Sequence, residues 1–475
     1  MTKAVSSLPS VCFFFFFFVI CAARWVPSVA GAASCAQTPF PDVCDHFIGR
    51  TMLDVQQSDE FSSLYSRSVS ATTGLAMQAR QAVSSIAGKS GDPRATMAWS
   101  DCLELLDDTI DLLSQSLTTA DSAYSQSLLS AAVANQQTCR NGFSDFNLDA
   151  TFNQLSPVLV NNISNLLSNA LAVNNGGKFP FALENRGRKL LSARFPSWVS
   201  GSDRRLLQAT PKADVVVAKD GSGNYKTVTE AVAAAKARGG GSRFIIYVKA
   251  GTYSENVVIS KTMKNIMIFG DGAASTVITG SKHAGQTTTF RSATFAVMGS
   301  GFIAKDITFE NTAGAQNHQA VALRSGSDLS VFYRCGFKGY QDTLYVYSMR
   351  QYYRECSIYG TVDFIFGDAA AVFQNCNIYL RNPMSGQTNT VTAQGRTDPN
   401  ENTGIVIHAS TIQGASDLSS GTKSYLGRPW QKYSRTVIMK SNIGGVINPA
   451  GWLPWSGNFA LSTLYYAEYM NTGSG

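Results

Sequence analysis

Three cysteines in the second half of the chain recur at almost equal intervals. Cys335, Cys356 and Cys376 stand 21 and 20 residues apart, and an aromatic residue precedes each by two or three positions. From residue 215 onward, short β-branched and aromatic runs alternate with Gly and Asn, and no helical stripe recurs between them. A period of about 20 residues built from short strands predicts a solenoid, here an all-β parallel β-helix.

The same period predicts a pair of neighbouring carboxylates. Residues one period apart lie on adjacent coils, about 4.8 Å apart along the axis. Asp342 and Asp363 are separated by 21 residues, so both are expected to project from one face of the solenoid. Close carboxylates split their pKa values, which suits one of them to be a nucleophile and the other a general acid. The alternative is that each Asp only caps a turn.

The 21-residue spacing also applies to Cys335 and Cys356. With one coil between them, Cys335 and Cys356 are expected to come within disulfide-bonding range. Cys376 would then be an odd buried thiol.

The amino-terminal segment has the pattern of an export signal. Lys3 precedes an apolar run over residues 11–23, which is too short to cross about 30 Å of hydrocarbon as a helix. Small residues suited to signal peptidase follow at 30–32. We therefore expect a signal peptide over 1–32, a secreted protein and no stable membrane span, with an uncleaved anchor as the alternative. The Asn-Ile-Ser sequon at 162–164 is compatible with glycosylation.

Residues 33–175 have helical spacing. One apolar stripe consists of Leu103, Leu106, Ile110, Leu113 and Leu117. A second stripe runs from Leu155 to Leu171. Several such helices in about 140 residues predict an all-α four-helix bundle. In an oxidising compartment Cys35 can bond to Cys44, and Cys102 to Cys139.

Residues 176–212 have the composition of a linker. They contain Asn-Asn-Gly-Gly, scattered Pro and Ser, and two basic tetrapeptides that end in Leu-Leu. An exposed basic connection between folded units is a favoured site of proteolysis. A processing protease is therefore expected to cut at Arg204-Arg205 or at Arg188-Lys189, and a merely flexible linker is the alternative.

Composition excludes several classes of function. The chain has four histidines and lacks the Cys-x-x-Cys, His-Glu-x-x-His, Gly-x-Ser-x-Gly and phosphate-loop motifs. We expect no metal, no cofactor and no nucleic acid partner. The net charge is +8 over residues 208–475 and −1 over residues 1–207. The basic half favours a polyanionic partner, although a solvated basic surface would have the same composition.

Two sets of motifs resemble known families. The first resembles the pectin methylesterase inhibitor family, through C-A-Q-T-P-F-P-D-V-C (35–44), S-D-C-L-E-L-L-D-D-T-I-D-L-L (100–113) and S-A-A-V-A-N-Q-Q-T-C-R-N-G-F (130–143). Residues 213–475 resemble plant-type pectin methylesterases, through G-T-Y-S-E (251–255), Q-A-V-A-L (319–323), G-Y-Q-D-T-L (339–344), D-F-I-F-G (363–367) and L-G-R-P-W (426–430). This second resemblance implies a right-handed parallel β-helix that removes methyl esters from homogalacturonan, the acidic backbone of pectin, in the cell wall.

The resemblance also implies a role for each matched catalytic residue. Asp363 would be the nucleophile that forms an acyl-enzyme, and Asp342 the general acid and then the general base. Gln319 and Gln341 would donate hydrogen bonds to the oxyanion. Arg428 would orient Asp363 and keep it ionised.

Substrate contacts follow from the same resemblance. Trp430 would offer an apolar stacking surface to the sugar, and Thr289 matches a further contact. Tyr345, Phe366 and Trp452 are weaker candidates, because aromatic residues of a β-helix more often pack in the core.

The two-part order suggests a pro-region that contacts its own catalytic domain until a protease separates them. Two alternatives stay open: a catalytically impaired wall-binding or inhibitory protein, and a lyase or polygalacturonase on the same fold. The resembling family usually continues for a few dozen residues past the position of Gly475, so a carboxyl-terminal tail is expected to be missing.

Overall fold

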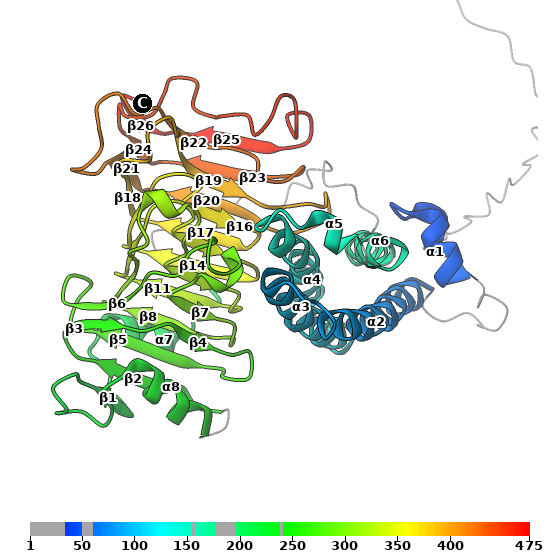
Figure 1. Ribbon diagram of the computed structural model, residues 1–475, viewed down its shortest axis with the longest axis horizontal. Coiled ribbons are helices and arrows are strands. Elements are labelled where there is room, and N and C mark those ends of the chain that lie inside the picture. The colour runs from blue at the N-terminus through cyan, green and yellow to red at the C-terminus, as the bar shows by residue number, and fades with distance from the viewer. Residues whose placement is uncertain (1–33, 50–59, 154, 156, 177–194, 238–240) are drawn as a thin grey trace, which may run out of the picture.

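The chain forms a helical bundle beside a tall stack of strands (Figure 1). The computed structural model describes residues 34–49, 60–153, 155, 157–176, 195–237 and 241–475. The predicted signal peptide and the Arg188-Lys189 site lie outside the described residues. Within them, no helix is both long and apolar enough to cross a bilayer.

The first half is the predicted four-helix bundle. Its long helices are α2 (Glu60–Ala87), α3 (Pro93–Thr118), α4 (Ser122–Ser144) and α6 (Pro157–Asn174), and shorter ones are α1 (Pro41–Phe47) and α5 (Asp149–Phe152). Asp92 and Asp121 cap α3 and α4 by accepting hydrogen bonds from backbone N–H groups of the first turn. The predicted Cys35–Cys44 and Cys102–Cys139 disulfides are both present.

The second half is a parallel β-helix with three sheets, as predicted. The sheet that faces the bundle contains β4 (Val257–Ile259), β7 (Phe295–Val297), β10 (Leu323–Ser325), β13 (Leu344–Val346), β16 (Ile365–Gly367), β19 (Asn389–Gln394) and β22 (Ser424–Gly427). We call it the cleft sheet.

The other two sheets complete each coil. The ten-stranded sheet contains β1 (Val215–Val217), β2 (Phe244–Val248), β5 (Ile266–Gly270), β8 (Ile303–Lys305), β11 (Ser330–Tyr333), β14 (Arg350–Arg354), β17 (Ala370–Gln374), β20 (Gly404–His408), β23 (Arg435–Met439) and β25 (Tyr465–Tyr469). The nine-stranded sheet contains β3 (Gly251–Ser254), β6 (Thr276–Gly280), β9 (Thr308–Asn311), β12 (Gly336–Lys338), β15 (Ser357–Gly360), β18 (Asn377–Leu380), β21 (Thr411–Gly414), β24 (Asn442–Ile443) and β26 (Thr472–Gly473). Helix α8 (Val228–Ala237) packs at the first coils.

The β-helix has a core of its own. Its largest cluster of buried apolar side chains draws only on residues between Val217 and Ile447, and none of them belongs to the bundle. Phe332, Tyr353 and Phe373 stack from coil to coil with ring centroids 4.6 and 4.5 Å apart. Since adjacent coils bury each other, the stack does not depend on the bundle for its core.

The predicted Cys335–Cys356 disulfide is wrong. Cys335, Cys356 and Cys376 are all buried free thiols, and burial raises the pKa of Cys356 and Cys376 well above the usual value. Each cysteine lies in the turn between a strand of the ten-stranded sheet and a strand of the nine-stranded sheet, so the three side chains keep the coil spacing of about 4.8 Å, whereas a disulfide needs Cβ atoms about 3.5–4.5 Å apart. The period placed the three sulfur atoms in one ladder but not within bonding distance.

Part of the predicted linker is folded. Residues 201–208 form helix α7 (Gly201–Gln208), capped by the Ser200 hydroxyl, which accepts a hydrogen bond from the Asp203 N–H. Leu207 is fully buried in a cluster on the outer face of the ten-stranded sheet. The side chain of Arg204 donates to the carbonyls of Val199 and Pro196. The second dibasic site therefore lies in a docked helix.

Candidate active site

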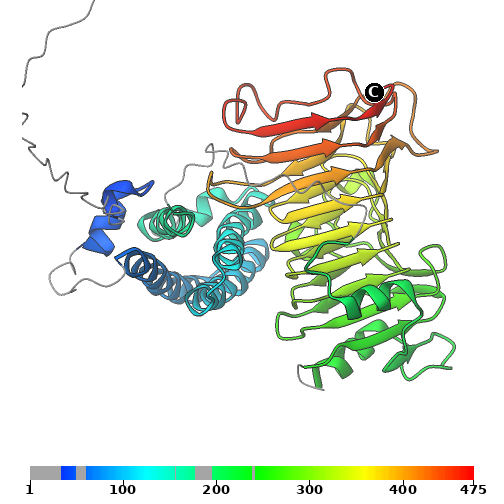
Figure 2. The same cartoon turned by 180° about the vertical axis from the view of Figure 1, so that it is seen from behind.

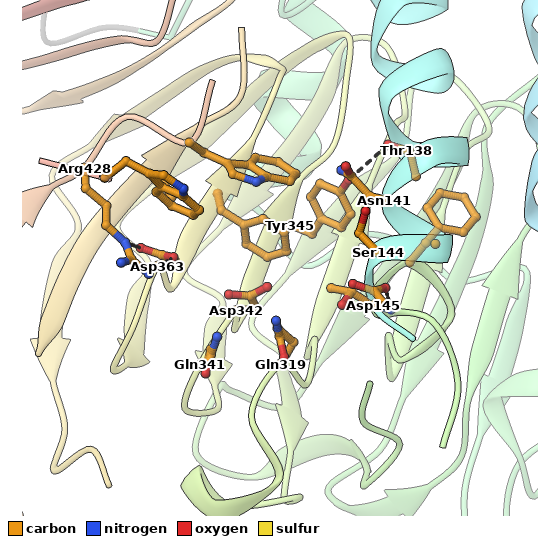
Figure 3. Close-up of a pocket in the computed structure, with 17 residues that line it drawn as sticks. Thr138, Asn141, Ser144, Asp145, Gln319, Gln341, Asp342, Tyr345, Asp363 and Arg428 are labelled. Carbon is orange, nitrogen blue, oxygen red and sulfur yellow. Dashed lines mark hydrogen bonds and ion pairs between the residues drawn. The ribbon is translucent and has the colours of Figure 1, made fainter. Parts of the chain in front are cut away.

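A cavity of about 370 Å³ lies between the cleft sheet and helix α4 of the bundle. All seven residues predicted from the sequence as catalytic or substrate-binding line it: Thr289, Gln319, Gln341, Asp342, Asp363, Arg428 and Trp430. The cavity is also lined by bundle residues, so two segments far apart in the sequence meet there (Figure 3).

The two aspartates occupy equivalent corners of neighbouring coils. Each lies two residues before a strand of the cleft sheet, and Leu344 of β13 pairs with Ile365 of β16. Asp342 and Asp363 both have positive φ angles, 61° and 52°. Asp tolerates this left-handed conformation better than most residues. The backbone thus turns both carboxyl groups toward the same cavity, as the 21-residue spacing predicted (Figure 3).

Asp363 accepts hydrogen bonds from an arginine and a threonine side chain. Arg428 donates to both of its oxygens, from Nε to Oδ1 at 2.8 Å and from Nη2 to Oδ2 at 2.7 Å. Thr390 donates its hydroxyl to Oδ1 at 2.6 Å and accepts the Asp363 N–H at 2.8 Å. Trp455 lies against the guanidinium, with its ring 4.3 Å from Arg428 Cζ. A bidentate arginine and a hydroxyl donor both favour the charged carboxylate.

Asp342 has the opposite environment. It is 7% exposed, and burial, followed by repulsion from Asp363 and Asp145, raises its pKa well above the usual value. Arg428 opposes this rise in the pKa of Asp342, but its direct hydrogen bonds go to Asp363. The arrangement favours the protonated form of Asp342, while the donors around Asp363 favour a carboxylate there, so the two carboxyl groups can perform different steps.

Two glutamine side chains lie next to Asp342. Gln319 and Gln341 are grouped beside Asp342, on the side of the cavity away from the aromatic rings (Figure 3). The Gln341 Oε1 atom is buried and accepts no hydrogen bond from the described residues. Both amide groups can donate hydrogen bonds to an oxygen atom in the cavity.

Aromatic rings cover another wall of the cavity. Tyr345 and Phe366 stack with centroids 4.2 Å apart, and Trp430 meets Phe366 edge-on at 5.8 Å. Trp452 does not line the cavity and packs instead against Tyr466 at 4.4 Å. Tyr345 and Phe366, treated as weaker candidates above, therefore reach the cavity, whereas Trp452 does not.

The bundle supplies a third carboxyl group. Asp145, just past the end of α4, accepts the backbone N–H of Thr289 at 2.7 Å and lines the cavity with Thr138, Asn141 and Ser144 (Figure 3). Burial raises the pKa of Asp145 to about 6. The Thr138 hydroxyl lies 3.3 Å from the Tyr345 hydroxyl. The end of helix α4 and Asp145 thus form one wall of the cavity.

Further contacts hold the bundle along the cleft sheet. Gln126 donates to the carbonyl of Asn400 at 2.6 Å, and the Ser130 hydroxyl donates to the Asn402 side chain at 3.2 Å. The fully buried Tyr347 hydroxyl donates to Asn135 of α4. Both views show α3 and α4 as the long helices nearest the stack (Figures 1 and 2).

Several residues of the site, among them Thr390, Trp455 and Asp145, were not singled out from the sequence. Thr390 follows Asp363 by 27 residues rather than by one regular coil, Trp455 lies in a long loop, and Asp145 belongs to the other domain. None of them carries a local signal. Within the described residues, no three His, Cys, Asp or Glu side chains are grouped so that they could hold a metal ion.

Comparisons with known proteins agree with the division of the chain into a helical bundle and a β-helix. A family model described as Pectinesterase matches residues 214–475, and one described as Plant invertase/pectin methylesterase inhibitor matches residues 31–173. The chain is 53% identical to Probable pectinesterase/pectinesterase inhibitor 6 of Arabidopsis thaliana and 52% identical to Pectinesterase 2 of Citrus sinensis. Each match covers 93% of this chain and 85% of the relative.

Solved structures resemble the β-helical part. A pectin methylesterase from carrot is 62% identical with a TM-score of 0.55, and the match covers 56% of this chain and 85% of the carrot chain. A pectin methylesterase from Aspergillus niger is 33% identical with a TM-score of 0.51, covering 56% of this chain and 87% of the fungal one.

Proposed function

We propose that this chain de-esterifies methyl-galacturonate units of pectin in the plant cell wall. The chain belongs to the pectinesterase family and carries an inhibitor-type domain ahead of its ester hydrolase domain. The observation that carries the proposal is the unequal pair of carboxyl groups. Asp363 accepts two hydrogen bonds from Arg428, which favour its charged form, and burial and repulsion favour the protonated form of Asp342. Ester hydrolysis through an acyl-enzyme needs this pair of protonation states.

In the first step an oxygen of Asp363 attacks the carbonyl carbon of the methyl ester. The carbonyl oxygen becomes an oxyanion, to which Gln319 and Gln341 donate hydrogen bonds. The intermediate collapses as the bond to the methoxy oxygen breaks, and Asp342 gives its proton to that oxygen. Methanol leaves, and an anhydride joins Asp363 to the galacturonate carboxyl group.

In the second step Asp342, now ionised, removes a proton from water. The resulting hydroxide attacks the galacturonate carbonyl carbon of the anhydride, and the bond to Asp363 breaks. The galacturonate leaves with a free carboxyl group, while Asp342 is protonated and Asp363 is ionised again. Arg428 and Thr390 favour the charged form of Asp363 and so make it a good leaving group. Trp430, Tyr345 and Phe366 provide the apolar wall against which a sugar ring can stack.

The bundle is proposed to act as a pro-region. Helix α4 and Asp145 cover the cavity, so an extended polysaccharide cannot reach Asp363 while the bundle is docked. Cleavage in the 176–212 segment of the secreted protein would let the bundle leave. The site at Arg204-Arg205 lies in the docked helix α7, so a protease must first unfold that helix from the sheet.

The proposal is tested by adding methyl-esterified pectin to the full-length protein before and after cleavage of the linker. We expect methanol release, no unsaturated uronate, and a large increase in rate once the bundle has been removed. Unsaturated product would instead identify a lyase, and shortened chains without methanol a polygalacturonase. Equal rates before and after cleavage would contradict the pro-region role, and no methanol in either state would contradict the esterase assignment.

A further inference from the structure

Arg324 is a buried cation without a carboxylate partner among the described residues. It is 4% exposed, forms no ion pair, and its Nε donates no hydrogen bond. Its Cζ lies 3.4 Å from the Phe290 ring centroid, and Nη1 lies 3.4 Å from the Met298 sulfur. Burying a guanidinium among apolar groups without an anion is costly, so the position points to a function that the docked state does not use.

The position of Arg324 in the cleft sheet is defined by strand register. Leu323 belongs to the β-helix core, so the next residue of β10 points outward, toward the cleft. Arg324 pairs with Tyr345 on the next coil and with Ala296 on the previous one. It therefore stands one coil from Tyr345 and two coils from Phe366, in the same outward row of side chains.

Two more cations flank this end of the cleft. Arg291 lies in the turn before β7, and Lys261 follows β4. Their side chains are 37% and 39% exposed in the docked state. Together with Arg324 they make the end of the cleft over β4, β7 and β10 positive.

Helix α3 places a row of acidic side chains over these cations. Asp101, Glu104, Asp108 and Asp111 follow one another at intervals of three and four residues, so they share one face of the helix. Asp101 and Glu104 bind Arg291, the latter at 2.8 Å, and Asp108 and Asp111 face Lys261. Burial lowers the pKa of Arg324, and the carboxylates that oppose this shift are Glu104 and Asp101.

We propose that the β4–β7–β10 end of the cleft binds free carboxylates of the pectin chain, with Arg324 as the central contact and Arg291 and Lys261 at the rim. The acidic row of α3 occupies this place while the bundle is docked and is replaced by galacturonate carboxylates after release. This inference rests on the proposed function, since it names the part of the substrate that the site selects.

The spacing fits a polysaccharide that lies along the stack. Coils are about 4.8 Å apart, so a carboxylate on Arg324 would lie roughly 5–10 Å from the ester carbon, about the span of one or two sugar rings. A carboxylate site at this distance favours a methyl ester that lies next to a de-esterified unit. Each unit that is de-esterified then improves the binding of the neighbouring stretch of chain.

The test compares binding of two hexamers: unesterified hexagalacturonate and its fully methyl-esterified counterpart. The protein is the full chain with a specific protease site inserted between residues 177 and 194, cut and freed of the bundle. The remaining β-helix keeps its own core and the docked α7. Dissociation constants are measured by calorimetry for wild type, Arg324→Gln and Arg324→Lys.

Arg324→Gln should weaken binding of the unesterified hexamer about tenfold and change binding of the methylated hexamer less than twofold, since only the former presents anions. Arg324→Lys should weaken binding of the unesterified hexamer less than Arg324→Gln does. Arg334→Gln is the matched control, because Arg334 carries the same charge but pairs with Asp306 and directly follows β11 of the ten-stranded sheet rather than lying in the cleft sheet. If Arg324→Gln lost equal affinity for both hexamers, or lost affinity for neither, the inference would be overturned.

Methanol release separates this inference from the esterase proposal. If wild type discriminates between the hexamers through Arg324 but releases no methanol, the carboxylate site stands and the esterase assignment fails. If wild type releases methanol and Arg324→Gln binds both hexamers as wild type does, the esterase stands and the carboxylate site fails. Thermal unfolding of each variant shows whether a loss of binding comes from a loss of fold.

Discussion

Docking of the bundle should weaken as pH rises through 6, and Asp145 should be one of the groups responsible. Its pKa is raised by burial from 3.8 to about 6 in the docked state. A carboxyl group with a raised pKa binds its proton more tightly when docked, so the docked state is favoured in acid. That contribution is complete below about pH 3.8 and is lost as pH rises through about 6.

The size of the effect follows from the shift of about two pH units. The full contribution is about 3 kcal/mol, reached only at strongly acid pH. Between pH 5.0 and 7.5, the linkage relation gives roughly a tenfold change in the dissociation constant, or about 1.4 kcal/mol. Asp101, Asp108 and Asp398 lie at the same interface, and burial raises the pKa of each, so their contributions have the same sign.

The assay isolates Asp145 by comparison with Asp145→Asn. Asparagine is neutral at both pH values and can still accept the Thr289 N–H. The dissociation constant between the bundle and the β-helix is measured by calorimetry on linker-cut protein at pH 5.0 and 7.5. The ratio of wild-type to variant affinity should fall about tenfold between the two pH values. An unchanged ratio, or tighter wild-type docking at pH 7.5, would refute the reasoning.

Three further predictions concern other parts of the molecule. Thr390→Val removes a hydroxyl donor from Asp363 and should lower kcat for methanol release about 10- to 100-fold. KM should stay nearly unchanged, and circular dichroism should show an intact fold. An unchanged kcat would show that this hydrogen bond does not contribute to catalysis. Ser200→Ala removes the α7 cap, worth about 1 kcal/mol, and should speed trypsin cleavage at Arg204-Arg205 about fivefold in full-length protein; an equal rate would mean that α7 does not protect the site. A thiol reductant should lower the Tm of the bundle and leave that of the β-helix unchanged, because the disulfides present lie in the bundle and the β-helix thiols are free; a loss of β-helix stability would contradict the free-thiol assignment.

The coil period predicted the site only where the coils are regular. From Cys335 to Cys376 no long loop interrupts the repeat, so Asp342 and Asp363 could be placed on neighbouring coils by counting. Beyond Leu380 a loop lengthens the coil, and Thr390 falls 27 residues after Asp363. A count of residues cannot predict a partner whose position depends on an inserted loop.

Other features depend on contacts that leave no local pattern. Arg428 stands 65 residues after Asp363, and only the resemblance to a family indicated it. Asp145 meets the cleft because two separately folded halves dock, and neither half contains that information alone. Helix α7 was missed because its eight residues, rich in charged and small side chains, are held by Leu207 against a sheet that forms later in the chain.

The central claim is that Asp363 is the nucleophile, and Asp363→Asn tests it most directly. Asparagine tolerates the same left-handed backbone, so the fold should persist. The matched control is Asp306→Asn, because Asp306 has a φ of 53° and accepts two bonds from Arg334, as Asp363 does from Arg428, but lies outside the cavity.

Methanol release from methyl-esterified pectin is measured for both variants after linker cleavage. We expect Asp306→Asn to retain wild-type turnover and Asp363→Asn to release no methanol above the uncatalysed rate, while both unfold in one transition as the wild type does. Substantial turnover in folded Asp363→Asn would contradict the account.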